Sequence, residues 1–289
     1  PYSVSWSNSL FEDAAEYGIG ILNSFNNLQN RIKKELVRIN NEDTKYLLEL
    51  LESNDYDKIK SELPKFKKYI KEDLLSFVTP KSVWTIGGDG WAYDIGFGGL
   101  DHVASSNEKV RILVLDTEVY SNTGGQSSKS SHLGQVCEFA SGGKKTSKKD
   151  LFKIAMSYPN IYVGSISLGG NFMQAIKTIK EAEEHDGPSI IIAYCPCIEQ
   201  GIKGGMSNSI KEEALAVDSG YVLLMRYKDN KLYLDSKEPN FDKYDEFLSN
   251  EVRYNALKIK DIQKANELLA INKEIAVQRY NYYKEISNK

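Results

Sequence analysis

The sequence has 289 residues, of which 41% are hydrophobic, so it can form one large globular domain or two small ones. Its 37 Lys and Arg residues are balanced by 40 Asp and Glu residues, and the formal net charge of −3 gives no case for a nucleic-acid partner. No apolar run reaches the roughly 18 residues that span a bilayer, no signal peptide starts the chain, and three cysteines are too few for a disulfide framework. We therefore expect a soluble cytoplasmic protein without a membrane partner. Because the first residue is Pro1 rather than Met, we also expect the chain to come from a longer polypeptide.

The N-terminal part reads as helical. A long amphipathic helix is predicted to start near residue 9, where Ser9 and Glu12 form a capping-box pattern. Apolar residues follow at intervals of three and four, namely Leu10, Ala14, Tyr17, Ile21, Phe25 and Leu28. From residue 40 to about 71 the sequence is highly charged, which is typical of short helices with one solvated face. We interpret residues 1–80 as a helical lead-in that packs on the core.

The pattern changes to short β-branched runs that are apolar on both faces, at residues 82–87, 110–116, 161–167 and 189–195. Helical patterns lie between them, at residues 93–105, 148–157 and 171–185. This alternation predicts an α/β fold with a mostly parallel, doubly wound sheet. A further strand is expected at 221–227, so we assign 81–230 to the α/β core. Residues 231–289 form a C-terminal extension that ends in a helix from 259 to near 286.

The first strand ends in GGDGW, residues 87–91. Gly88 and Gly90 permit positive φ and let backbone amides approach a ligand closely, which suits a phosphate at the start of the next helix. A carboxylate beside a phosphate is repelled unless a hard cation lies between them, so Asp89 predicts Mg²⁺ bridging a diphosphate. The loop after the second strand, DTEVYSN, supplies two further oxygens, the Thr117 hydroxyl and the Val119 carbonyl.

These residues also admit other interpretations. The glycines could serve only to let the helix at 93–105 pack closely on the sheet. A dinucleotide-binding loop would need a third glycine at Tyr93, and a Walker loop would need G-K-[ST], which is absent. Tyr120, Ser121, Thr123 and Gln126 are equally plausible as supporting contacts and as plain loop residues. The basic run at 143–150 fits a solvated helix start or a site for an anionic partner such as coenzyme A or ferredoxin, and the three histidines, His102, His132 and His185, read as structural.

G-D-G followed about thirty residues later by an oxygen ligand and then a carbonyl resembles the thiamine diphosphate motif. The strings around it are similar to one branch of that family, the pyruvate:ferredoxin oxidoreductases. The similar strings lie at residues 6–18, 87–103, 116–129, 143–151, 189–202, 219–227 and 234–240. The resemblance covers nearly the whole chain and is weakest at 40–80 and after about 255.

This resemblance implies a thiamine-diphosphate-binding fold and specific roles. Asp89, Thr117 and Val119 would hold Mg²⁺, and Asn122 would lie against the diphosphate and the reacting end of the cofactor as the candidate catalytic residue. The cofactor-binding residues would be Gly88, Asp89, Gly90, Trp91, Thr117, Val119 and Asn122. The family decarboxylates pyruvate oxidatively to acetyl-coenzyme A and passes the electrons through iron-sulfur clusters to ferredoxin, flavodoxin or a fused flavoprotein. Thr117 departs from the Asn that many thiamine enzymes place there but agrees with this branch.

The resemblance also indicates what the chain lacks. The pyrimidine-binding domain is absent, and of the four cysteines that hold the nearest 4Fe-4S cluster only one, Cys197, has a counterpart here. Three cysteines cannot build a four-Cys cluster, so Cys197 would be a ligand only in the full-length protein, and Cys137 has no counterpart. Without the resemblance, Cys197 would read as a buried small apolar residue.

We therefore expect an inactive fragment whose partners are the remaining domains of a parent that is homodimeric at full length. Two alternatives stay open, namely the same domain of a related 2-oxoacid oxidoreductase and an isolated, inert cofactor-binding module. The parent would be located in the cytoplasm or in an anaerobic organelle derived from mitochondria.

Overall fold

The computed structural model describes residues 15–288, and contacts within it divide the chain into two units. One unit is residues 17–83, and the other joins residues 84–289 to the segment that ends at Glu16. We describe each unit by itself. The boundaries proposed at residues 80 and 230 stay predictions.

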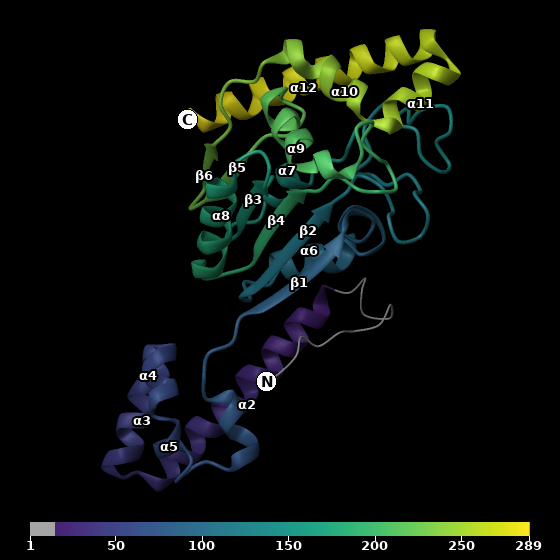
Figure 1. The fold of residues 1–289 in the computed structure, drawn as a ribbon. Helices are drawn as coiled ribbons and strands as arrows, with labels where there is room; N and C mark the ends of the chain where they lie inside the picture. Colours follow the sequence, from purple (N-terminus) through teal and green to yellow (C-terminus); the bar gives the residue numbers. More distant parts are fainter. Residues whose placement is uncertain (1–14, 289) are drawn as a thin grey trace. The chain divides into compact units, whose positions relative to one another are not determined.

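The first unit is helical (Figure 1). It contains α2 (Glu16–Ile39), α3 (Glu42–Ser53), α4 (Tyr56–Ser61), α5 (Leu63–Phe66) and the 3₁₀ helix η1 (Glu72–Phe77). The capping box of α3 explains its start, since the Asn41 side chain accepts from the Thr44 backbone N–H and Thr44 Oγ1 accepts from the Asn41 N–H. These helices share a core that includes Ile32, Leu47 and Phe66. The predicted helix is present as α2, whereas its proposed start at Ser9 and Glu12 lies outside the described residues.

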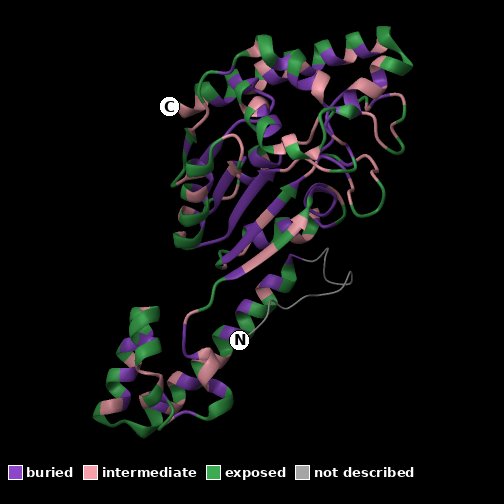
Figure 2. Ribbon diagram, in the orientation of Figure 1, coloured by how far each residue is buried: buried purple, intermediate pink, exposed green. Residues whose placement is uncertain are grey.

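The second unit contains a six-stranded sheet in the order β1-β2-β4-β3-β5-β6. Its strands are β1 (Val83–Gly88), β2 (Val110–Asp116), β3 (Tyr162–Ile166), β4 (Ser189–Tyr194), β5 (Met225–Lys228) and β6 (Lys231–Leu234). Parallel pairing joins β4 to β2 and β3, whereas β5 runs antiparallel to β3 and β6. Figure 2 shows the central strands buried, and every residue of β4 is buried as its apolar run predicts. The α/β class is confirmed.

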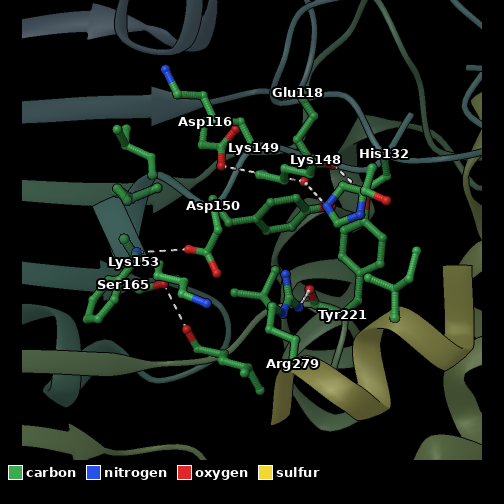
Figure 3. Close-up of a pocket in the computed structure, with 18 of the residues that line it drawn as sticks. Asp116, Glu118, His132, Lys148, Lys149, Asp150, Lys153, Ser165, Tyr221 and Arg279 are labelled. Carbon is green, nitrogen blue, oxygen red and sulfur yellow. Dashed lines mark hydrogen bonds and ion pairs between the residues drawn. The ribbon is translucent and has the colours of Figure 1, made fainter. Parts of the chain in front are cut away.

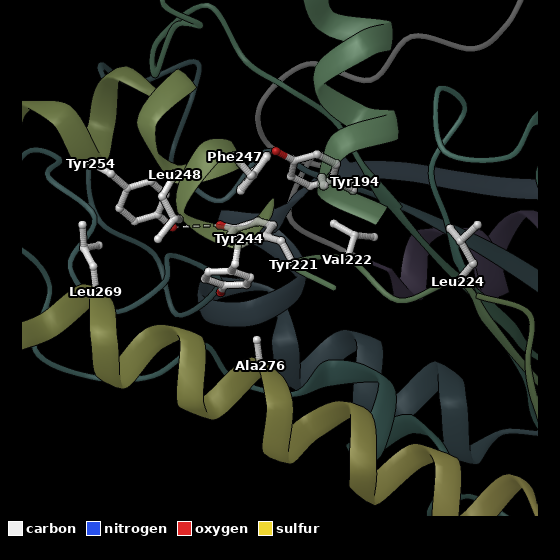
Figure 4. Close-up of a cluster of buried hydrophobic side chains, with 11 residues drawn as sticks. Tyr194, Tyr221, Val222, Leu224, Tyr244, Phe247, Leu248, Tyr254, Leu269 and Ala276 are labelled. Carbon is white, nitrogen blue, oxygen red and sulfur yellow. Dashed lines mark hydrogen bonds between the residues drawn. The ribbon is translucent and has the colours of Figure 1, made fainter. Parts of the chain in front are cut away.

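The last part of the sheet differs from the expectation. The strand predicted at 221–227 begins only at Met225, because the residues before it turn into a buried aromatic cluster around Tyr221, drawn in Figure 4. β6 was not expected from the sequence. It pairs with β5 through a two-residue turn in which Asp229 and Asn230 both have positive φ, the conformation of a type I′ hairpin.

Helices cover both faces of the sheet, as a doubly wound fold requires. The helices of this unit are η2 (Gly90–Ile95), α6 (Phe97–Ser105), α7 (Leu151–Ala155), α8 (Phe172–Glu184), η3 (Met206–Asn208), α9 (Ser209–Asp218), η4 (Phe241–Lys243), α10 (Tyr244–Asn250), α11 (Val252–Lys260) and α12 (Ile262–Ser287). α8 packs on the side of Ile191 and Ala193, and α7 and α12 lie on the side of Ile192 and Tyr194.

The C-terminal helix that the sequence predicts from residue 259 to near 286 is present as α12, which begins at Ile262 after a separate helix, α11. α11 ends at Lys260, and Asp261 caps α12 by accepting from the Lys264 N–H. None of the helices in the described part of the chain is long and apolar enough to cross a membrane.

Candidate functional site

The three oxygens predicted to hold Mg²⁺ meet at the ends of two strands. Asp89 directly follows β1, and Thr117 directly follows β2. Thr117 Oγ1 lies 2.8 Å from Asp89 Oδ1 and 3.1 Å from the Val119 carbonyl oxygen. Ser121 Oγ joins them at 2.8 Å from Thr117 Oγ1. We call residues 116–122 the cation loop.

These distances suit the coordination of Mg²⁺. The ion binds six oxygens at about 2.0–2.1 Å in an octahedron, so neighbouring ligand oxygens lie about 3 Å apart. The separations of 2.8 and 3.1 Å around Thr117 Oγ1 match this spacing. No group of three His, Cys, Asp or Glu side chains in the described residues could hold a metal. A cation here would therefore rely on the mixed donor set together with oxygens of a bound ligand.

Asp89 forms no ion pair within the described residues, although it is only 1% exposed. Its Oδ2 accepts from Ser128 Oγ at 2.5 Å and from Ser130 Oγ at 3.1 Å. Burial, and then the nearby Asp116 carboxylate, raise the pKa of Asp89 to about 6, although hydrogen bonds from Ser128 and Thr117 and the charge of Lys148 oppose the rise. A divalent cation would supply the missing positive charge, so the residues fit Mg²⁺.

The glycines before η2 act in a way that the sequence did not predict. Neither Gly88 nor Gly90 has positive φ, so the expectation of a left-handed turn was wrong. A Cβ on Gly90 would lie 2.3 Å from the Tyr120 ring, whose hydroxyl donates to the Gly90 carbonyl at 3.3 Å. Gly88 faces open space. Gly90 is thus required for close contact with the cation loop, and Gly88 leaves room beside Asp89.

Trp91 is 5% exposed and fits between two further glycines. A Cβ would lie 2.4 Å from the indole at Gly87 and 2.1 Å from it at Gly96. The Trp91 Nε1 is buried without a hydrogen-bond partner. Close packing against Gly87 and Gly96 therefore holds the indole in place, and its Nε1 is left without a hydrogen bond.

Asn122 and Cys197 complete the predicted site residues. Asn122 is exposed in the cation loop. Cys197 is half-buried after β4, and its Sγ donates to Ser121 Oγ at 3.3 Å, so the fold brings this thiol to the same loop. Cys137 and Cys195 are also free thiols, and burial raises the pKa of Cys195 to about 12.

Sequence reasoning missed the centre that supports the cation loop, Glu118. Its backbone is left-handed at φ 63°, which is a strained conformation for a residue other than glycine. Its buried carboxylate contacts four side chains, Lys148 Nζ at 2.8 Å, Arg253 Nη1 at 2.6 Å, Tyr221 OH at 2.6 Å and His132 Nε2 at 3.0 Å. We call these five residues the Glu118 cluster, and Figure 3 shows Glu118 beside Lys148 and His132.

The charges of the Glu118 cluster are set by its cations. Burial opposes ionisation of Glu118, but the attraction of Lys148 and Arg253 outweighs it and holds the pKa of that carboxyl well below its usual range. Burial lowers the pKa of His132 to about 4, so this imidazole is neutral. Glu118 lies between Thr117 and Val119 in the sequence. The contacts that hold Glu118 in place therefore also hold the two predicted cation ligands in place.

The basic run at 143–150 leads into α7, whose N-cap is Asp150, and Lys145 in it is exposed, but two of its other lysines turn inward. Lys148 is largely buried and bridges Asp116 at 2.5 Å and Glu118 at 2.8 Å. Lys144 donates to the carbonyls of Ser128 at 2.7 Å and Ser131 at 2.5 Å. These two lysines are internal partners of the site. The signal for this arrangement in the sequence is the pair of acids at the end of an apolar strand, Asp116 and Glu118. Carboxylates buried there need cationic partners.

Comparisons with known proteins relate this sequence to one family of enzymes. Residues 75–193 match the family of the thiamine pyrophosphate enzyme, C-terminal TPP binding domain. The chain is 41% identical to the pyruvate:ferredoxin oxidoreductase of Moorella thermoacetica and 39% identical to the pyruvate-flavodoxin oxidoreductase of Klebsiella pneumoniae, in each case over 99% of this chain. It is also 39% identical, over 98% of its length, to the mitochondrial pyruvate dehydrogenase [NADP(+)] of Euglena gracilis.

The chain spans 27%, 26% and 17% of the lengths of these three relatives, which are much larger proteins. These matches cover nearly the whole chain, whereas the family model covers the segment that holds β1, the cation loop and all but the last residue of β4. The chain therefore contains a thiamine pyrophosphate-binding domain and is a relative of the pyruvate:ferredoxin and pyruvate-flavodoxin oxidoreductases.

Proposed function

We propose that this chain binds the diphosphate of thiamine diphosphate through Mg²⁺, as one part of a larger pyruvate oxidoreductase. The observation that carries the proposal is that Asp89 Oδ1 and the Val119 carbonyl oxygen lie 2.8 and 3.1 Å from Thr117 Oγ1, while the Asp89 carboxylate is buried and forms no ion pair within the described residues. A dinucleotide-binding loop would need a third glycine at Tyr93, and a Walker-type site would need G-K-[ST], which the sequence lacks.

Each residue has a role in this proposal. Asp89 Oδ1, Thr117 Oγ1 and the Val119 carbonyl hold the ion, and Ser128 and Ser130 orient Asp89 by hydrogen bonds. Backbone amides at Gly88 and Gly90 and the side chain of Trp91 contact the cofactor. Asn122, exposed in the cation loop, is the residue we assign to the diphosphate and the reacting end. When bound, thiamine diphosphate supplies the carbon chemistry of decarboxylation, and the protein supplies binding and orientation.

The activity of the whole protein is part of the proposal. We infer oxidative decarboxylation of pyruvate to acetyl-coenzyme A in a cytoplasmic or organellar homodimer, with Cys197 as one ligand of a 4Fe-4S cluster in the full-length protein. The names of the relatives give three different acceptors, ferredoxin, flavodoxin and NADP⁺, for similar matching segments. This supports an acceptor that is selected outside the present chain. A related 2-oxoacid oxidoreductase is the second candidate.

The deciding experiment is a calorimetric titration of the chain with thiamine diphosphate, with excess Mg²⁺ in one series and with a chelator in the other. We expect Mg²⁺-dependent binding that Asp89→Ala weakens by more than about tenfold. Asp101→Ala is the matched control, because it removes a carboxylate from α6 in the same stretch without touching the cation loop. Undiminished binding by Asp89→Ala would contradict the proposed site.

A second assay separates the enzyme from the inert module. The isolated chain is supplied with pyruvate, coenzyme A, thiamine diphosphate, Mg²⁺ and an artificial electron acceptor. We expect no turnover, because the cluster needs four cysteines and this chain has three. Measurable acetyl-coenzyme A would show that the chain is complete for the reaction.

A further inference from the structure

A cavity of about 360 Å³ lies behind the cation loop, on the face of the sheet opposite α8 (Figure 3). Its walls on the sheet side are Ser165 of β3, Ile192 and Tyr194 of β4, and Met225 of β5. The rest of the wall comes from α7 and α12, from the segment before β5, from the cation loop, and from Tyr93 and residues 132–133 and 147–150. The volume is in the range of small-molecule sites.

The sequence explains why this face is incompletely filled. α7 has only five residues, whereas α8 on the other face has 13. A helix of five residues covers about 7.5 Å of strand length, less than half of what a strand of five residues spans. α12 closes the far side, where Tyr283 is fully buried and Tyr282 is partly exposed.

The cavity and the predicted cation site share the cation loop as a wall. The side chains of Asp116 and Glu118 line the cavity, whereas Thr117 Oγ1 and the Val119 carbonyl lie on the side of Asp89. The cavity is therefore distinct from the place where the diphosphate is proposed to bind, and Asp89 does not line it.

Two cations on the α7 and α12 side carry no carboxylate partner within the described residues. Lys153 is exposed, and its ammonium lies 4.1 Å from the centre of the Tyr282 ring. Arg279 Nη2 donates to the backbone carbonyls of Gly220 and Tyr221, and its buried Nε has no hydrogen-bond partner. Of the other lining lysines, Lys148 is neutralised by Asp116 and Glu118, whereas Lys149 donates to the Tyr93 carbonyl at 3.1 Å and lies over the Phe97 ring.

The one acid on this side, Asp150, is satisfied by neutral donors. Its Oδ2 accepts from the Tyr283 hydroxyl at 2.7 Å, and its Oδ1 accepts from the Lys153 backbone N–H at 3.0 Å. The balance of unpaired charge at the cavity is therefore positive, which favours an anionic group there.

The remaining wall is aromatic and aliphatic. Rings of Tyr93, Phe152, Tyr194, Tyr221, Tyr282 and Tyr283 line it. Such a wall favours a flat apolar body, whose burial contributes most of the affinity of a small ligand, with a few polar contacts fixing its orientation. From this arrangement we infer a second small-molecule site, which takes an organic acid with an aromatic body and a carboxylate directed at Lys153 and Arg279.

The test uses two probes with the same body and opposite charge, 3-phenylpropanoate and 3-phenylpropan-1-amine, each titrated into the chain by ligand-observed NMR. We expect saturable binding of the acid with a Kd at or below about 1 mM and binding of the amine at least about fivefold weaker. Equal binding of the two probes, or no saturable binding of the acid, would overturn the inference.

Three variants locate the site. Lys153→Met should remove the preference for the acid, and Lys284→Met, on α12 but not lining the cavity, should keep it.

Ile192→Phe, which adds a ring inside the cavity, should abolish binding of the acid while the thermal unfolding temperature shows a folded chain. An unchanged preference in Lys153→Met, or unchanged binding in folded Ile192→Phe, would contradict the site. Asp89→Asn should not alter binding of the acid, so this result is independent of the proposed cofactor site.

Discussion

Thr117 Oγ1 donates to Asp89 Oδ1 at 2.8 Å, across 28 residues of sequence, because the neighbouring strands β1 and β2 end side by side in the sheet. Thr117→Val keeps the shape and removes the oxygen. We expect it to weaken Mg²⁺-dependent binding of thiamine diphosphate by more than about tenfold. Thr117→Ser keeps the hydroxyl and should stay close to the wild type in the same titration. If both variants bind equally well, Thr117 is not a ligand.

Replacing Asp89 should affect stability and binding in opposite directions. The folded-state pKa of Asp89 is raised from 3.8 to about 6, so ionisation destabilises the metal-free fold by about 3 kcal/mol above that pH. Asp89→Asn is nearly isosteric and neutral, and it should raise the free energy of unfolding in chelator at pH 8 by up to this amount. The same variant should lose Mg²⁺-dependent binding. Urea unfolding and calorimetry measure the two effects, and a destabilised variant would show that Asp89 is structural.

Gly90 should tolerate no side chain. The Cβ of Gly90→Ala would meet the Tyr120 ring at 2.3 Å, so the ring or the turn must shift. We expect a loss of about 1–3 kcal/mol in the free energy of unfolding. Gly88→Ala is the matched control, because nothing lies within 4 Å of its Cβ position. Combining Gly90→Ala with Tyr120→Ala should recover part of the loss, and failure to recover it would place the clash elsewhere.

Glu118→Gln should be severely destabilising. It leaves the Lys148 and Arg253 charges buried without this carboxylate, and we expect a loss of about 3–5 kcal/mol in urea unfolding. Glu267→Gln, an exposed carboxylate on α12, should change stability little. A double-mutant cycle with Arg253→Met should give strong coupling. Additive effects would mean that Glu118 and Arg253 act independently.

Glu212 gives the chain a pH dependence away from the cation loop. Its Oε2 accepts from Asn250 Nδ2 at 3.1 Å and its Oε1 is buried without a partner. Burial, and then the nearby Glu251, raise its pKa from 4.5 to about 7. A raised carboxyl pKa means that folding favours the protonated form, so the contribution of Glu212 to stability falls as pH rises from about 4.5 to about 7.

Glu212→Gln removes this titration. We expect the variant to be more stable than the wild type by about 2 kcal/mol at pH 8 and equal to it near pH 4.5. Unfolding by urea at a series of pH values measures the difference. A stability gain that is the same at every pH would contradict the assignment to Glu212.

Two kinds of feature could be predicted from the sequence, namely those set by neighbouring residues and those set by the general geometry of parallel strands. Buried strands follow from apolar β-branched runs, and the meeting of Asp89 with Thr117 follows from parallel strands ending at one edge. The Glu118 cluster could not be predicted, because its partners Tyr221 and Arg253 lie 103 and 135 residues away. The need for glycine at position 90 was recognised for the wrong reason, because it depends on a ring in another loop.

Two further features do have a local signal. Asp229 and Asn230 tolerate positive φ and stand between apolar positions, which indicates a hairpin. Asp261 is a favourable N-cap residue, which indicates where α12 begins. By contrast, the inward turn of Tyr221 depends on aromatic partners in α10 and α11 and has no signature in its own segment.

Arg253 stands in α11, sixty residues beyond the end of the segment that matches the thiamine pyrophosphate domain family at residue 193. Shortening the chain to the six strands alone would retain every predicted cation ligand but leave the Glu118 carboxylate without its guanidinium. The left-handed backbone at Glu118 would then lose one of the contacts that hold it. The smallest piece of this chain that keeps the cation loop in shape is therefore set by Arg253 and not by the last strand.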